Sequence, residues 1–299
     1  MSAVLSALSS HDKALPQSFE IRPFASTVGA EIIGLDLAKP LDAQDFARIH
    51  RAHLDHHVLV FRQQVITPQQ HINFSRRFGE LQIHVLDQFL LAGHPEILIV
   101  SNVVENGRNI GLGDAGKFWH SDLSYKALPS LGSMLHAQTL PSEGGDTVFA
   151  DMHQALEAVP EAVRRVIEGR HAAHSYTARY AETKFEGNWR PTLTAEQLAQ
   201  VREVTHPIVR THPETGRQAL FVSEGFTTRI VGLPDDESRD ILQQLYALSV
   251  REAHLYRHQW QPQDLVFWDN RSLIHLAAGC PPKLPRTLFR TTIQGDAPF

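Results

Sequence analysis

The chain has 299 residues, of which 42% are hydrophobic and 20% charged, with a formal net charge of -5 and a single cysteine. A chain of this size and composition can bury one extensive core, so we expect a single domain over residues 18–299 after a flexible N-terminal tail over residues 1–17. The acidic balance excludes a basic nucleic-acid-binding face, the one cysteine excludes an internal disulfide, and no apolar run reaches the roughly 18 residues of a membrane span, so we expect a cytoplasmic protein without nucleic-acid or membrane partners.

The first third of the chain alternates short strands with helices. Strand-like runs occupy residues 19–24 and 30–37. A helix is predicted over residues 42–57, where apolar residues recur at helical spacing and Asp42 is the N-cap. The apolar run VLVF at residues 58–61 is typical of a buried strand.

A second helix is predicted over residues 67–81. Thr67 is its N-cap, Pro68 takes the first helical position, and Gln70 completes a capping box. Gly79 can end the helix because glycine readily adopts the left-handed conformation.

The rest of the chain is rich in short strands separated by glycine, proline and asparagine. Two further helices are predicted at residues 160–169 and 237–250. The pattern indicates a mainly β fold with helices, a two-sheet sandwich or jelly roll rather than a parallel α/β sheet. The predicted strands cover residues 96–103, 133–140, 146–152, 204–212, 218–223, 253–260, 264–270 and 287–295.

The stretch KFWHSDLSY at residues 117–125 places His120 two positions before Asp122. In an extended chain such residues point to the same side and can share one metal ion. Spacing alone decides little, since a second His-x-Asp pair, His53 and Asp55, occurs in the first predicted helix. Residues two apart in a helix point in nearly opposite directions, so that pair cannot share an ion.

A third ligand and two arginines make the combination specific. His275 lies on or at the end of a predicted strand, and Arg286 and Arg290 are four residues apart, which puts both guanidinium groups on one strand face. Two histidines and one carboxylate on one face of an octahedral ion suit non-haem Fe(II), and they leave positions for a bidentate 2-oxo acid and O2. The forked, permanently charged arginine suits the distant carboxylate of such a co-substrate.

The chain resembles the Fe(II)/2-oxoglutarate-dependent dioxygenases typified by taurine dioxygenase and 2,4-dichlorophenoxyacetate dioxygenase. The likeness is carried by the residues above and by RRFGELQIH, EGGDTVF and WQPQDLVFWDNR. It implies a double-stranded β-helix, a cupin-like jelly roll flanked by helices. It also implies that Fe(II) is bound by His120, Asp122 and His275, and that Arg286 and Thr147 hold the far carboxylate of 2-oxoglutarate. In the implied reaction, O2 and 2-oxoglutarate give succinate and CO2 while a substrate C–H bond is hydroxylated.

The resemblance also implies a site for a small anionic substrate. The residues that match the sulfonate-binding histidine and arginine of the taurine enzyme are His84 and Arg290. Asp87 replaces a tyrosine on the amine side of that site, and Asn102 is a further candidate for lining the pocket. Taurine itself is therefore not expected, whereas an alkyl or aryl sulfonate, a sulfate ester or an aryloxyalkanoate fits.

Two other function classes remain open at this point. One is a zinc hydrolase that uses the same three ligands, and the other is a non-catalytic, metal-binding, cupin-like sensor of a small anion. Members of the family often form dimers or tetramers, so we expect a homo-oligomer. The glycine-rich stretch over residues 105–117 is predicted to be a mobile lid over the pocket.

Overall fold

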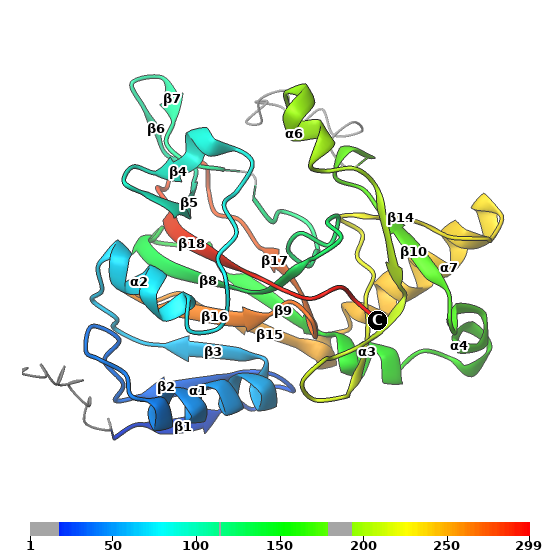
Figure 1. The fold of residues 1–299 in the computed structure, drawn as a ribbon, viewed down its shortest axis with the longest axis horizontal. Helices are drawn as coiled ribbons and strands as arrows, with labels where there is room; N and C mark the ends of the chain where they lie inside the picture. Colours follow the sequence, from blue (N-terminus) through cyan, green and yellow to red (C-terminus); the bar gives the residue numbers. More distant parts are fainter. Residues whose placement is uncertain (1–17, 114, 179–192) are drawn as a thin grey trace, which may run out of the picture.

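The computed structural model describes residues 18–113, 115–178 and 193–299, and it is built mainly of β-strands (Figure 1). The tail predicted over residues 1–17 lies outside the described residues. Among the helices of the described segments, none has both the length and the apolar character needed to cross a bilayer.

The largest element is an eight-stranded sheet. Neighbouring strands are antiparallel except for the parallel pair at residues 30–33 and 58–61. Their order across the sheet is β1 (Glu20–Pro23), β2 (Ala30–Ile33), β3 (Val58–Phe61), β16 (Leu265–Asp269), β8 (Ser130–Thr139), β18 (Thr287–Gln294), β5 (His94–Ser101) and β4 (Leu90–Leu91).

A second sheet packs against one face of the large one. It contains β15 (Leu255–His258), β9 (Thr147–Asp151) and β17 (Leu273–Ala277), with β9 in the centre. Side chains from both sheets form a shared core, in which the rings of Phe149 and Trp268 lie 5.6 Å apart. The Trp268 ring is also 4.7 Å from the ring of His275, so this core borders the predicted metal site directly.

Smaller sheets complete the β structure. One contains β11 (Val204–Pro207), β10 (His171–His174) and β14 (Thr227–Ile230); another pairs β12 (Val209–Thr211) with β13 (Gln218–Leu220); and β6 (Val104–Glu105) forms a hairpin with β7 (Arg108–Asn109).

Helices cover the outside of the sheets (Figure 1). The helices α1 and α2 pack on the large sheet, whereas α3 and α7 pack together beside the smaller sheets. The helices are α1 (Ala43–His56), α2 (Pro68–Ser75), α3 (Met152–Glu157), α4 (Glu161–Ile167), α6 (Ala195–Ala199) and α7 (Asp235–Ser249), with short 3-10 helices η1 (Asp87–Phe89) and η2 (Glu252–His254).

The predicted helix starts are confirmed. Asp42 accepts a hydrogen bond from the backbone N–H of Asp45 at 2.7 Å, and Thr67 and Gln70 form the capping box of α2. The end of α2 was predicted too late, because the helix ends at Ser75 rather than near Gly79. Beyond that point the chain leaves the helix as the Phe78 ring packs against the aromatic side chains of α1 and the sheet.

The register of the large sheet places two site residues on one face. In the pairing of β18 with β8, Arg290 is opposite Leu135 and Thr292 is opposite Ser133. Because side chains two residues apart share a face, Arg290 and Ser133 point to the same side of the sheet. Both side chains reach the carboxylate of Asp122 there.

Candidate metal centre and its two cavities

His120 and His275 face each other across a single β-bridge. The N–H of His120 donates to the carbonyl of His275 at 3.1 Å, and the reciprocal bond is 2.8 Å. His275 lies within β17, but His120 precedes a turn, so the extended strand predicted over residues 117–125 is limited to this one bridge. Leu123 has a φ of 58°, and the left-handed turn there begins directly after Asp122.

The three predicted metal ligands converge. The Nε2 atom of His120 is 3.5 Å from Oδ1 of Asp122, and Nε2 of His275 is 3.8 Å from Oδ2. One potential ligand atom from each residue lies within 4.8 Å of the others, and all three side chains are buried. Residues 155 positions apart in the chain therefore meet as the sequence predicted.

The protonation states suit a divalent cation. The Nδ1 atom of His120 lies 2.9 Å from the carbonyl of Phe118 and 3.1 Å from that of His275, so Nδ1 carries the proton and the lone pair of Nε2 is available. Burial keeps the pKa of His275 well below its usual value. Burial alone would raise the pKa of Asp122, but Arg290 and the two histidines hold it well below its usual value. Two imidazoles and one carboxylate form the donor set expected for non-haem Fe(II).

Two residues that the sequence did not single out hold the carboxylate of Asp122. The hydroxyl of Ser133 donates to Oδ2 at 2.7 Å, and the Asn270 amide donates to the same oxygen at 3.5 Å. The side-chain oxygen Oδ1 of Asn270 accepts a hydrogen bond from the backbone N–H of Asp122 at 3.2 Å and another from Trp268 Nε1 at 3.1 Å. Such outer partners orient metal ligands and raise metal affinity.

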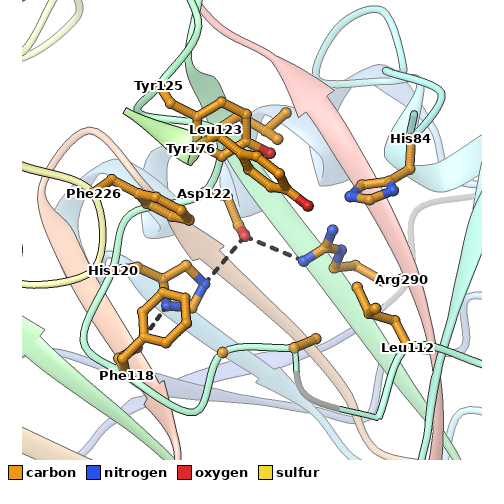
Figure 2. Close-up of a pocket in the computed structure, with 12 residues that line it drawn as sticks. His84, Leu112, Phe118, His120, Asp122, Leu123, Tyr125, Tyr176, Phe226 and Arg290 are labelled. Atoms are coloured by element: carbon orange, nitrogen blue, oxygen red, sulfur yellow. Dashed lines mark hydrogen bonds and ion pairs between the residues drawn. The ribbon is translucent and has the colours of Figure 1, made fainter. Parts of the chain in front are cut away.

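A small pocket of about 30 Å³, here called the His84 pocket, adjoins the metal ligands (Figure 2). His84 and the Arg290 guanidinium lie next to each other on one side of it, and Phe118 and Phe226 lie beside His120. The remaining lining residues include Leu112, Leu123, Tyr125 and Tyr176.

Arg290 is tied to the metal centre. Its Nη1 atom donates to Oδ1 of Asp122 at 3.2 Å, while its Nε atom is buried without a hydrogen-bond partner among the described residues. The Arg290 guanidinium therefore already has a carboxylate counter-ion, whereas its Nε–H group makes no hydrogen bond within the described residues.

A second cavity of about 410 Å³, here called the Arg286 cavity, contains the other predicted arginine. The Arg286 Nε atom donates to the carbonyl of Gly145 at 3.1 Å. Among the described residues, no carboxylate lies within salt-bridge distance of Arg286, and burial lowers its pKa to about 10. Glycine at position 145 allows the Arg286 side chain to approach the backbone this closely, because a Cβ atom there would lie 3.2 Å from the Arg286 Nε atom. Gly145 also has a φ of 82°, which favours glycine.

The other predicted site residues differ in position. Asn102 lines the Arg286 cavity rather than the His84 pocket, and its Oδ1 accepts the backbone N–H of Arg286 at 2.8 Å. Thr147 is buried in β9 opposite Ala277, a residue that lines the Arg286 cavity. Asp87 is exposed at the start of η1 and lines neither cavity.

The predicted lid forms a wall between the two cavities. Leu112 and Ala115 line both of them. The backbone N–H of Leu112 donates to Ile99 in β5 at 2.9 Å, and the carbonyl of Gly116 accepts from Ala277 in β17 at 2.7 Å. The wall is therefore anchored to both sheets, and its mobility stays a prediction.

Comparison with known proteins gives consistent matches. The sequence model described as "Taurine catabolism dioxygenase TauD, TfdA family" matches residues 20–292. Pentalenolactone F synthase of Streptomyces arenae is 32% identical over 288 residues, covering 93% of this chain and 96% of that protein. The (S)-phenoxypropionate/alpha-ketoglutarate-dioxygenase of Sphingobium herbicidovorans is 33% identical over 294 residues, with coverage of 93% and 96%.

A solved structure shares the fold. The crystal structure of a taurine dioxygenase from Burkholderia xenovorans has a TM-score of 0.77 and 32% identity, covering 94% of this chain and 91% of that one. The predicted fold, a mainly β jelly roll with flanking helices, is confirmed.

Proposed function

Because the chain belongs to the taurine catabolism dioxygenase TauD, TfdA family and is an alpha-ketoglutarate-dependent dioxygenase, we propose that it hydroxylates a C–H bond of a small anionic substrate. The proposed co-substrates are O2 and 2-oxoglutarate, which is alpha-ketoglutarate, and the products include succinate and CO2. The observation that carries the proposal is the buried convergence of His120, Asp122 and His275 beside two separate arginine-lined cavities.

Fe(II) would be held by the three converging side chains. When bound, it would supply the redox chemistry that couples O2 to decarboxylation of the 2-oxo acid. The protein presents two imidazoles, of which burial keeps that of His275 neutral, and an ionised Asp122 carboxylate. Ser133 and Asn270 restrict rotation of the Asp122 carboxylate.

The Arg286 cavity is the proposed site of 2-oxoglutarate. Within the described residues, the half-buried Arg286 side chain bonds a carbonyl oxygen and no carboxylate, so its guanidinium favours an incoming carboxylate. Thr147 Oγ1 accepts a hydrogen bond from Trp260 Nε1 at 3.1 Å, so its own O–H remains able to donate to that carboxylate. Asn102 would act through the backbone of Arg286 rather than by touching the substrate.

The His84 pocket is the proposed site of the substrate anion. His84 and the unpartnered Nε of Arg290 supply donors, and aromatic side chains supply an apolar wall. The relatives named above for phenoxypropionate and taurine act on molecules with a carboxylate and a sulfonate, which supports an alkyl or aryl sulfonate, a sulfate ester or an aryloxyalkanoate. Asp87 has no part in this proposal because it is exposed outside both cavities.

A turnover assay tests the proposal. Purified protein is incubated with Fe(II), ascorbate, O2 and 2-oxoglutarate, and succinate is measured with each member of a panel of sulfonates, sulfate esters and aryloxy acids. We expect one class of compound to raise succinate formation and to be converted to a hydroxylated product or to the breakdown product of that species. His120→Ala should abolish both the succinate and the product.

Two other results would contradict the proposal. Hydrolysis of a panel member with Zn(II) in the absence of O2 would indicate a zinc hydrolase. Binding of an anion without O2 consumption, at saturating Fe(II) and 2-oxoglutarate, would indicate a sensor.

A further inference from the structure

A third cavity lies next to the metal centre but shares no residue with the His84 pocket or the Arg286 cavity. It has a volume of about 220 Å³, and we call it the Trp119 cavity. Its lining includes Trp119 and Ile274, the residues immediately before His120 and His275. Since neighbouring side chains of extended segments point to opposite sides, this cavity lies behind the bridge that carries the two histidines.

The body of the cavity is apolar and aromatic. Ile274 belongs to a buried core cluster, and Trp119 and Tyr246 of α7, both partly buried, pack against it. The Tyr246 hydroxyl already donates to the carbonyl of Thr227 at 3.0 Å, so the ring is what this residue offers to a ligand. The wall therefore suits an apolar group or a cation held against aromatic rings.

A buried hydroxyl, of Ser223, and an exposed carboxylate, of Glu224, line the cavity. Ser223 is 2% exposed, and its hydroxyl has no hydrogen-bond partner among the described residues. Leaving a buried hydroxyl unsatisfied is unfavourable, and a ligand donor or acceptor that bonds it would offset this cost. The Glu224 carboxylate accepts one long bond, 3.4 Å, from the backbone N–H of Trp119.

The electrostatics favour a cation. Glu224 has no arginine, lysine or histidine within salt-bridge distance in the described part of the chain, and no basic side chain lines the cavity there. Val250, the C-cap of the 15-residue helix α7, also lines it. The C-terminal end of a helix carries partial negative charge, which adds to that of Glu224.

We propose that the Trp119 cavity binds a small primary ammonium ion that has an apolar body. The ammonium group donates to the Glu224 carboxylate and the Ser223 hydroxyl, and the body packs on Trp119 and Tyr246. The volume admits a fragment-sized ligand rather than a macromolecular segment. Such a ligand would contact the residues adjoining two proposed metal ligands without entering the reaction site.

Calorimetric titration of the full chain with three probes tests the inference. Benzylammonium, benzyl alcohol and benzoate share a ring and differ in charge. We expect benzylammonium to bind at least about tenfold more tightly than benzyl alcohol, since a hydrogen bond to a charged group contributes about 1.5–3 kcal/mol. Benzoate should not bind at this site, and saturating Mn(II) with 2-oxoglutarate should leave the benzylammonium affinity unchanged.

Two variants and a control locate the site. Glu224→Gln should weaken benzylammonium binding about tenfold or more while leaving any benzyl alcohol binding unchanged. Ala247→Trp fills the cavity from an exposed position of α7 without removing a contact and should abolish binding, whereas Gln244→Trp, an exposed α7 residue outside the cavity lining, should preserve it.

Several results would overturn the inference. These are no benzylammonium binding, equal binding of benzylammonium and benzyl alcohol, full affinity in Glu224→Gln or Ala247→Trp, or competition with 2-oxoglutarate. None of them depends on turnover, so failure here is distinguishable from failure of the proposed oxygenase activity.

Discussion

Arg286 and Arg290 are four residues apart and both border cavities beside the metal centre, yet their surroundings are opposite. Arg290 is paired with Asp122, a proposed metal ligand, and borders a pocket of about 30 Å³. Within the described residues, the Arg286 side chain bonds the Gly145 carbonyl and no carboxylate, and it borders a cavity of about 410 Å³. The two arginines therefore differ in what they can bind, because Arg290 already has a carboxylate partner and Arg286 has none there.

The largest effect is expected at Arg286. Arg286→Gln should weaken 2-oxoglutarate binding about a hundredfold, because a charge-assisted contact worth about 2.7 kcal/mol is lost. Mn(II) affinity should stay within about threefold, since Arg286 does not contact the metal ligands. Titration calorimetry measures both.

Lys117→Gln is the matched control, because Lys117 is the other basic residue that lines the Arg286 cavity and is exposed. If Lys117→Gln weakened 2-oxoglutarate binding as much as Arg286→Gln, the half-buried Arg286 guanidinium would not be the specific anchor.

Ser133→Ala should act on the metal centre alone. Loss of the hydroxyl that fixes Oδ2 of Asp122 is expected to weaken Mn(II) binding about ten- to hundredfold. The absorption spectrum of the Co(II)-substituted protein should change as well. Ser249→Ala, which removes a buried hydroxyl of α7 that donates to the Leu245 carbonyl rather than to this carboxylate, should leave both unchanged. Equal losses in the two variants would point to a general effect on stability.

Arg290→Gln should raise the substrate concentration needed for half-maximal succinate formation about tenfold or more, since a charged donor is lost from the pocket. Unlike Arg286→Gln, it should leave 2-oxoglutarate binding within about threefold. A large loss of 2-oxoglutarate affinity would mean that the two arginines act as one site, and the contrast between them would not hold.

Buried histidines provide a neutral counterpart to the two arginines. Burial lowers the pKa of His53, His71 and His174 to about 3, compared with about 6.5 in an unfolded chain. Between these values the unfolded chain binds more protons, so the free energy of unfolding falls as the pH falls below about 6.5. Each histidine contributes a slope of up to about 1.4 kcal/mol per pH unit.

Urea unfolding at a series of pH values from 7 to 4.5 measures this slope. His53→Phe should reduce it, because the ring stacks on Phe267 at 3.9 Å and its nitrogens make no hydrogen bond within the described residues. An unchanged slope in this variant would show that His53 does not resist protonation in the folded protein.

Much of the fold and the metal trio could be predicted from the sequence because they follow local rules. Capping residues set the starts of α1 and α2, and the His-x-Asp pair with a later strand histidine predicted the convergence. The hydrogen bonds from Ser133 and Asn270 to Asp122 could not be predicted, since they join residues 11 and 148 positions apart through side-chain orientation.

Other features depended on the packing of the whole chain. Asn102 was expected at the substrate, but the pairing of β5 with β18 places it beside Arg286. Trp119 was treated only as part of its motif, and its contribution to a separate cavity depends on how α7 packs behind the bridge. Tertiary contacts between distant elements fix these positions, and such contacts leave no local pattern in the sequence.

The wall formed by Leu112 and Ala115 lines both the His84 pocket and the Arg286 cavity. A bulkier or smaller residue there would change the volume of the proposed substrate pocket and of the proposed 2-oxoglutarate cavity together. Variants in which this wall is altered to admit a larger substrate would therefore also have an altered affinity for 2-oxoglutarate. Changes at Tyr125 or Phe226, which line the His84 pocket but not the Arg286 cavity, would alter the range of substrates without that effect.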